Sequence, residues 1–295
     1  MLTRRRLLAA TPLALAAFAA PFRASASGNP RRIAAIDWAA AEALVALGAT
    51  PVAVSDTQYF RQRMPVSLPE SVADIGPFWE INLERLAAIA PDAILANSSS
   101  LTMTPAIGEI APVEQVPDRA EEGRRFELAV AIMTHAAGVA GVPQADVDAC
   151  LADVEARLAV QRQRLGDTRR PILVLLPDQN GRRTMVYGDG SLPDAVLKKL
   201  GLANAWTGPV NANGLAQVGL DALMPLDGAT FVQVEIPTLK VRTARSLARS
   251  ALWQRLEPIR AARSVTIPQF HPFGGLPSVI HFAETLVPAL EGLPA

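Results

Sequence analysis

Aromatic and hydrogen-bonding side chains gather in short segments that directly follow apolar runs of the sequence. Phe78 and Trp79 come after one such run, and a row of serines at 98–100 comes after the next. His271 and Phe273 follow the last run. Flat rings beside hydroxyl, amide or guanidinium donors suit the recognition of a bulky organic ligand. The predicted ligand contacts are Arg61, Arg63, Phe78, Trp79, Ser98, Ser100, Tyr187, Asn213, His271 and Phe273.

The same segments offer little for catalysis or for a resident metal ion. The three histidines are far apart in the sequence and Cys150 is the only cysteine, so no ligand spacing typical of a metal site occurs. The sequence contains neither a G-x-S-x-G turn nor a glycine-rich phosphate loop. A catalytic triad of Ser98, His271 and a carboxylate would have to form between two separate lobes of the chain. Lobes that can move relative to each other would hold its geometry poorly. We predict no catalytic residue, no metal ligand and no cofactor.

Composition limits the class of partner. The chain has 295 residues, of which half are hydrophobic, and its 28 basic and 28 acidic side chains give a net charge of zero. A globular protein without a basic field is expected, so no nucleic-acid partner is predicted. The single cysteine also rules out a disulfide within the chain.

The first residues predict export. Three arginines at 4–6 precede an apolar stretch at 7–20 and the small residues Ala24-Ser25-Ala26. This order is typical of a removable signal peptide, which we place at residues 1–26. The arginines also fit the twin-arginine signal, which carries folded proteins across the bacterial inner membrane. The mature protein is therefore predicted to lie in the periplasm.

Short apolar runs alternate with helical patterns along the mature chain. Predicted strands lie at 33–36, 51–54, 72–75, 93–96, 172–176, 184–187, 231–235 and 264–267. Such alternation predicts α/β units with mainly parallel sheets. Residues 143–165 break the rhythm, because their apolar positions recur at helical spacing over about 35 Å.

The predicted fold class is α/β: two α/β lobes joined by a single long backbone helix, with the ligand cleft between the lobes. We place the N-terminal lobe at 29–141, the linking helix at 142–168 and the C-terminal lobe at 169–295.

Seven stretches give the sequence a family resemblance. They are RRIAAIDW (31–38), EALVALG (42–48), VSDT (54–57), LPESV (68–72), NLE (82–84), NAW (204–206) and HF (281–282). In order and spacing the chain resembles the periplasmic ferrichrome (hydroxamate siderophore) binding proteins of iron-uptake ABC systems. The resemblance implies a monomeric receptor that passes a ferric siderophore to an inner-membrane ABC permease driven by a cytoplasmic ATPase. It also implies that Glu84 and Asp221 dock on arginines of that permease.

The resemblance breaks down in the pocket. The arginine that contacts hydroxamate oxygens in the family falls at Phe78, and a pocket tyrosine falls at Ser100. Three aromatic positions of the second lobe fall at Asn213, His271 and Phe273. A hydroxamate-like or mixed siderophore is therefore expected.

Two questions stay open at this point. Either Arg61 or Arg63 is expected to replace the missing cation. Cobalamin or haem binding in the same architecture, and a periplasmic hydrolase, are the alternative functions.

Overall fold

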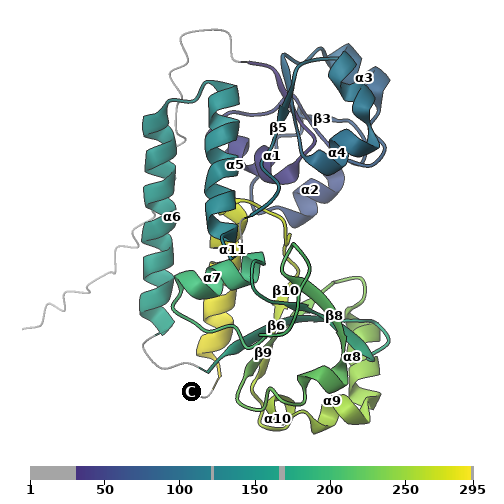
Figure 1. Ribbon diagram of the computed structural model, residues 1–295, viewed down its shortest axis with the longest axis vertical. Helices are drawn as coiled ribbons and strands as arrows, with labels where there is room; N and C mark the ends of the chain where they lie inside the picture. The colour runs from purple at the N-terminus through teal and green to yellow at the C-terminus, as the bar shows by residue number, and fades with distance from the viewer. Residues whose placement is uncertain (1–30, 121–122, 166–169, 294–295) are drawn as a thin grey trace, which may run out of the picture.

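A computed structural model describes residues 31–120, 123–165 and 170–293 of the chain. The predicted export signal at 1–26 lies outside the described residues. The two α/β lobes lie one above the other beside the long helices α5 (Arg125–Ala140) and α6 (Gln144–Leu165) (Figure 1). The predicted fold class of two α/β lobes with a long linking helix is confirmed.

The N-terminal lobe is built on a parallel sheet of five strands in the order β3-β2-β1-β4-β5. Buried alanine, valine, isoleucine and leucine side chains fill both faces of its central strands, as expected for a parallel sheet covered by helices. Its elements are β1 (Ile33–Ala35), α1 (Trp38–Ala46), β2 (Ala53–Val54), α2 (Thr57–Arg63), β3 (Ala73–Asp74), α3 (Leu83–Ile89), β4 (Ala93–Ala96), α4 (Ser98–Met103), η1 (Pro105–Glu109) and β5 (Val113–Gln115).

The C-terminal lobe has a mixed sheet in the order β10-β9-β6-β7-β8, in which β7 runs antiparallel to both of its neighbours. Its elements are β6 (Ile172–Pro177), β7 (Arg183–Tyr187), α7 (Leu192–Lys199), β8 (Leu215–Gly219), η2 (Leu220–Leu223), β9 (Thr230–Glu235), α8 (Lys240–Arg249), α9 (Ala251–Arg255), α10 (Glu257–Arg260), β10 (Ser264–Pro268) and α11 (Leu276–Glu291).

Strand register brings the segments of the candidate site to one edge of each sheet. Ala35 of β1 lies opposite Val54 of β2 and Leu95 of β4, so the residues that follow these three strands leave the sheet together. In the C-terminal lobe, Pro268 of β10 lies opposite Glu235 of β9. Ligands bind beyond the carboxyl ends of strands in such folds, and the register places the candidate residues there.

Besides the linking helix α6, the last helix α11 also packs on both lobes. α6 is continuous over 22 residues, and its buried stripe includes Val147, Val154 and Leu158. α6 packs on α5 and on α11, the last helix of the chain, which also contacts α1 and α5 of the N-terminal side and α7 of the C-terminal side. Exposed ion pairs such as Arg157–Glu284 (2.8 Å) border this packing and contribute at most about 1 kcal/mol each. Within the described ranges, no helix combines the length and apolar character needed to cross a membrane.

Several elements were not predicted from the sequence. Residues 59–63 lie in helix α2, whose first N–H, on Thr57, donates to Asp74 of β3 at 2.7 Å. The serines at 98–100 open α4, where the side chain of Asn97 accepts the N–H of Ser100 at 3.0 Å. The strands β5 and β8 lie at the edges of their sheets and contain polar residues. They therefore lack the continuous apolar run that predicts a buried strand.

The packing of α6 makes a stability prediction. Leu158 is 2% exposed inside the stripe, whereas Val160 on the same helix is 53% exposed. We expect Leu158→Ala to lower the free energy of unfolding by about 2–4 kcal/mol because it leaves a cavity. Val160→Ala is the matched control and should change it by less than about 0.5 kcal/mol. Urea denaturation followed by circular dichroism measures both, and equal effects would contradict the packing of α6 described above.

Candidate ligand-binding site

A pair of rings joins the two lobes at the predicted site. Trp38 opens α1 and His271 follows β10, and their ring centroids are 5.1 Å apart. The indole Nε1 of Trp38 donates to the carbonyl oxygen of Ser55 at 2.8 Å, and Phe60 packs edge-on against the indole at 5.6 Å. Trp38 therefore bridges the lobes, although its position between a strand and a helix predicts a residue of the core. Its place directly after the first strand is the signal that could have revealed this role.

His271 is neutral at pH 7. Burial lowers its pKa, the charges of Arg63 and Arg125 lower it further, and the resulting pKa is about 4. The ring centroid of Phe273 lies 5.9 Å from that of His271, and Phe273 is 46% exposed. The two side chains thus give the C-terminal lobe an uncharged aromatic surface beside Trp38.

Arg61 and Arg63 point to different sides of α2. The guanidinium of Arg61 donates to the carbonyl oxygens of Leu68 and Pro69 at 3.2 and 2.9 Å, so Arg61 ties down the loop after the helix. Arg63 lies over the ring of Tyr59, with its Cζ 4.9 Å from the centroid, and its charge acts on His271. Two residues span about 200° of a helix, which explains why only Arg63 faces the site.

Phe78 and Trp79 lie in the loop between β3 and α3, with ring centroids 4.9 Å apart in an edge-to-face arrangement. Both are exposed. The base of their loop is fixed, because the N–H of Asp56 at the start of α2 donates to the carbonyl oxygen of Gly76 at 2.9 Å. Within the described residues, no ring contact joins this pair to Trp38 or His271, so the loop adds a separate aromatic patch next to α2.

Tyr187 and Ser100 differ from the prediction. Tyr187 is 3% exposed, its ring packs 5.4 Å from that of Phe270, and burial raises its pKa to about 12. Ser100 is fully buried, and its hydroxyl donates to Asn97 Oδ1 at 3.2 Å. Neither side chain presents surface to a ligand. Each is the last or inner residue of a regular element, and packing turned it towards the core.

Ser98 and Asn213 form hydrogen bonds within their own lobes. The hydroxyl and N–H of Ser98 both donate to Asp118, so its proton is not directed at a histidine. Asn213 is exposed in a turn whose N–H groups are accepted by the side chain of Asn211. Among the described residues, no contact links Ser98 to His271, and no three His, Cys, Asp or Glu side chains gather as a set of metal ligands.

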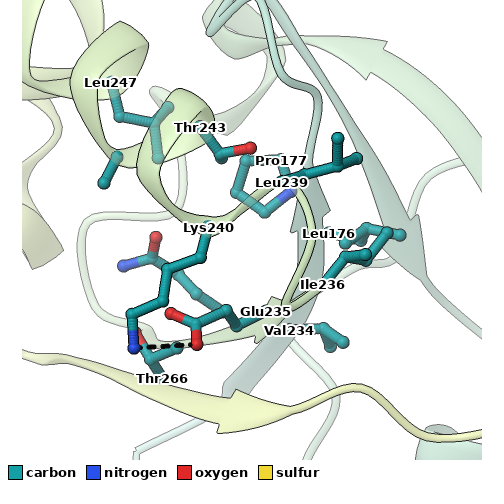
Figure 2. A pocket seen from close by; sticks show the side chains of 12 residues that line it. Leu176, Pro177, Val234, Glu235, Ile236, Leu239, Lys240, Thr243, Leu247 and Thr266 are labelled. Carbon is teal, nitrogen blue, oxygen red and sulfur yellow. Dashed lines mark ion pairs between the residues drawn. The ribbon is translucent and has the colours of Figure 1, made fainter.

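A pocket adjoins the site on the side of the C-terminal lobe. It lies at the carboxyl ends of β6 and β9, beneath the first turns of α8 (Figure 2). Pro177, Ile236 and Leu239 form apolar walls, and Lys240 pairs with Glu235 at 3.0 Å across its lining. The N–H of Gln269 donates to the carbonyl oxygen of Glu235 at 3.0 Å, which places the pocket next to the segment leading to His271.

Glu84 and Asp221 are exposed, each in the first turn of a short helix. Glu84 is in α3 of one lobe, and Asp221 is in η2, directly after β8 of the other. Both α3 and β8 lie on the side of the molecule away from α6 (Figure 1). Each lobe therefore carries one of the predicted docking acids at an exposed helical position.

Comparisons with known proteins agree on the architecture. The model of the periplasmic binding protein family matches residues 33–263. The iron(3+)-hydroxamate-binding protein FhuD of Escherichia coli K12 is 28% identical over 297 residues, covering 99% of this chain and 98% of the relative.

Two solved structures are similar as well. The siderophore-binding protein FhuD of Vibrio cholerae, solved with Fe³⁺–Desferal, has a TM-score of 0.81 at 26% identity and covers 90% of this chain and 99% of its own. The triscatecholate siderophore-binding protein FeuA of Bacillus subtilis has a TM-score of 0.67 at 16% identity, over 88% of this chain and 92% of its own, and shares the fold.

The environment of His271 makes a prediction about pH. Because its pKa is lower in the folded protein than in the unfolded chain, the folded state binds fewer protons between about pH 4 and 6.5. The stability that His271 contributes is complete above pH 6.5 and is lost as the pH falls towards 4. Between pH 7 and pH 5 we expect His271 to account for a loss of about 1–2 kcal/mol. Urea denaturation of the wild type and of His271→Asn at both pH values measures this. Equal losses in the two proteins would contradict the prediction.

Proposed function

Because the chain belongs to the periplasmic binding protein family, we propose that it binds a ferric siderophore between its lobes and delivers it to an ABC importer. The chelator supplies the ligands to iron, and the protein reads the outer surface of the complex. No bond is made or broken by the protein in this role.

One observation carries the proposal. Uncharged rings from both lobes meet at the carboxyl edges of the two sheets, with Trp38 and His271 5.1 Å apart, and the charge of Arg63 acts on His271. Rings of this kind pack on the hydrocarbon and carbonyl surface of a bulky chelate. A guanidinium donates charge-assisted hydrogen bonds to anionic oxygens such as those of hydroxamates or carboxylates. The names of the FhuD relatives from two organisms point to the same class of ligand.

The residues divide the work of binding. Arg63 takes the part of the family arginine that is replaced by Phe78, while Phe78 and Trp79 extend the apolar surface from their loop. His271 and Phe273 contact the ligand from the other lobe. The apolar walls of the pocket beneath α8 offer room for a hydrocarbon arm of the chelate.

Quenching of tryptophan fluorescence tests the proposal directly. Titration with ferric Desferal, a ferric carboxylate siderophore, haem and cobalamin should give saturable quenching with a ferric siderophore. Tight binding of haem or cobalamin alone would replace the proposal with one of those ligands. Conversion of the chelate into a product, lost in Ser98→Ala or His271→Asn, would establish a hydrolase instead.

The same titration separates the two arginines. We expect Arg63→Ala to raise the dissociation constant for the ferric siderophore about tenfold, because one charge-assisted hydrogen bond is lost. Arg61→Ala is the matched control on the same helix and should change it by less than about twofold, since its guanidinium is engaged with Leu68 and Pro69. Equal effects of the two substitutions would remove Arg63 from the site.

We further propose how the protein is exported and which protein it docks on. Arg4, Arg5 and Arg6 would direct export by the twin-arginine pathway, and the mature protein would act as a monomer in the periplasm. Glu84 and Asp221 would pair with arginines of the inner-membrane permease, one from each lobe. Acids at these exposed positions also suit the positive N-terminal ends of their helices, and both roles are compatible.

Charge reversal tests the docking acids. We expect Glu84→Lys combined with Asp221→Lys to abolish iron-limited growth on the ferric siderophore, because like charges would then face each other. The dissociation constant measured by fluorescence should be unchanged. Asp153→Lys, at an exposed position of α6, is the control and should support normal growth. Normal growth of the double variant would contradict the docking role.

A further inference from the structure

The segment between β10 and α11 belongs to the C-terminal lobe by its position in the chain but rests on the N-terminal lobe. This segment is residues 271–275, the last five of the loop at 269–275, and it carries both His271 and Phe273. Its first ring packs on Trp38 of α1, and its last residues lie against Glu42 of α1 and Arg125 of α5. The contacts that hold this segment therefore come from the opposite lobe.

Glu42 forms the first of these contacts. It is fully buried, and it accepts hydrogen bonds from the N–H of Gly275 and from the hydroxyl of Ser278 at 2.8 Å. Both partners lie at the start of α11, a helix of 16 residues. Burial raises the pKa of Glu42 to about 8, against the effect of these hydrogen bonds and of Arg125. Burying a carboxyl group is unfavourable in free energy unless it is hydrogen-bonded. Glu42 meets this condition by bonding Gly275, which is 233 positions away in the sequence.

Arg125 forms the second contact. Its side chain is buried at 8% exposure, and its Nη2 donates to the carbonyl oxygen of Gly274 at 2.7 Å. Burial lowers the pKa of Arg125, and the charge of Asp37, the N-cap residue of α1, opposes this effect. Asp37 is itself held by the side-chain amide of Asn97 at 2.8 Å.

Two glycines allow the close approach. A side chain at position 274 would collide with Ser278, and one at 275 would lie 3.2 Å from Glu42 Oε1 and 3.4 Å from the carbonyl oxygen of Ala39. Gly274-Gly275 thus lets the backbone reach Glu42 directly. At positions 274 and 275, Glu42 and Arg125 bond only backbone atoms, so these two hydrogen bonds do not involve the side chain of Phe273.

We propose that Glu42 and Arg125 are positioning residues that hold residues 271–275 on the N-terminal lobe and thereby set where His271 and Phe273 meet the ligand. This inference rests on the proposed function for its effect on binding. The statement that Glu42 and Arg125 hold residues 271–275 in place does not depend on any ligand.

Hydrogen exchange measured by mass spectrometry tests the holding of the segment without ligand. In Glu42→Ala and in Arg125→Met we expect the peptide spanning residues 270–276 to exchange about tenfold faster, because each variant removes a buried hydrogen bond. The peptide of α6 should be unchanged in both. Glu42→Gln should exchange like the wild type, since its carbonyl can accept from Gly275 and its amide can donate to Ser278. Unchanged exchange in folded Glu42→Ala would overturn the proposal.

Titration with ferric Desferal tests the effect on the site. Glu42→Ala and Arg125→Met should raise the dissociation constant about tenfold, and Glu42→Gln and Arg125→Lys should restore it to within about threefold. Faster exchange with an unchanged dissociation constant would overturn the positioning role. If Glu42→Ala does not fold, Ser278→Ala, which removes one of the two hydrogen bonds, should still speed exchange about threefold, and a failure to do so would overturn the proposal.

The two proposals fail in different ways. If the wild type binds no ferric siderophore, the proposed function is wrong, while the exchange rates still decide whether Glu42 and Arg125 hold the segment. If the wild type binds and the variants bind equally well, the positioning role alone is wrong.

Discussion

Glu42 and Arg125 are ionisable side chains enclosed between two lobes, and burying such groups is unfavourable unless their neighbours compensate. The compensation comes from both sides of the junction: Asp37 and Asn97 belong to the N-terminal lobe, while Gly274, Gly275 and Ser278 come from the far end of the chain. Because hydrogen bonds hold only over a narrow range of distances, the bonds of Glu42 and Arg125 to Gly274, Gly275 and Ser278 fix the loop after β10 and the start of α11 against α1 and α5. The aromatic surface of the candidate site is built on that placement.

The junction also limits how the lobes can move. A binding protein with a few flexible hinge strands can close around its ligand by a large rotation. Here α6 lies beside both lobes, and α11 packs on α6 and on helices of both lobes, so a rotation would break this apolar packing as well as the buried polar contacts. A receptor of this kind recognises a ligand whose shape fits a largely preformed surface. This suits a ferric chelate, whose iron centre is rigid.

The distribution of charge at the site bears on the class of ligand. The guanidinium of Arg63 lies over the uncharged ring of Tyr59. The guanidinium of Arg61 instead donates its hydrogen bonds to backbone carbonyl oxygens of its own lobe. His271 adds no positive charge near neutral pH because burial and the two nearby arginines keep it neutral. In the proposed site, aromatic rings thus lie close to the charge of Arg63, an arrangement that would suit a chelate whose charge lies on oxygens at its surface.

The sequence by itself determined the alternation of strands and helices, the long amphipathic helix and the division into two lobes, because these depend on local periodicity, capping residues and glycine stops. It also placed His271, Phe273, Phe78 and Trp79 after strands, where chain direction brings them to a sheet edge. Only the tertiary structure decided which side chains face the ligand. Tyr187 turned into the core, where its ring packs on Phe270, and Arg61 turned to the loop after α2, where its guanidinium donates to the carbonyl oxygens of Leu68 and Pro69. The pairing of Glu42 with Gly275 spans 233 positions, and no local pattern records a contact that forms only when both ends of the chain have packed.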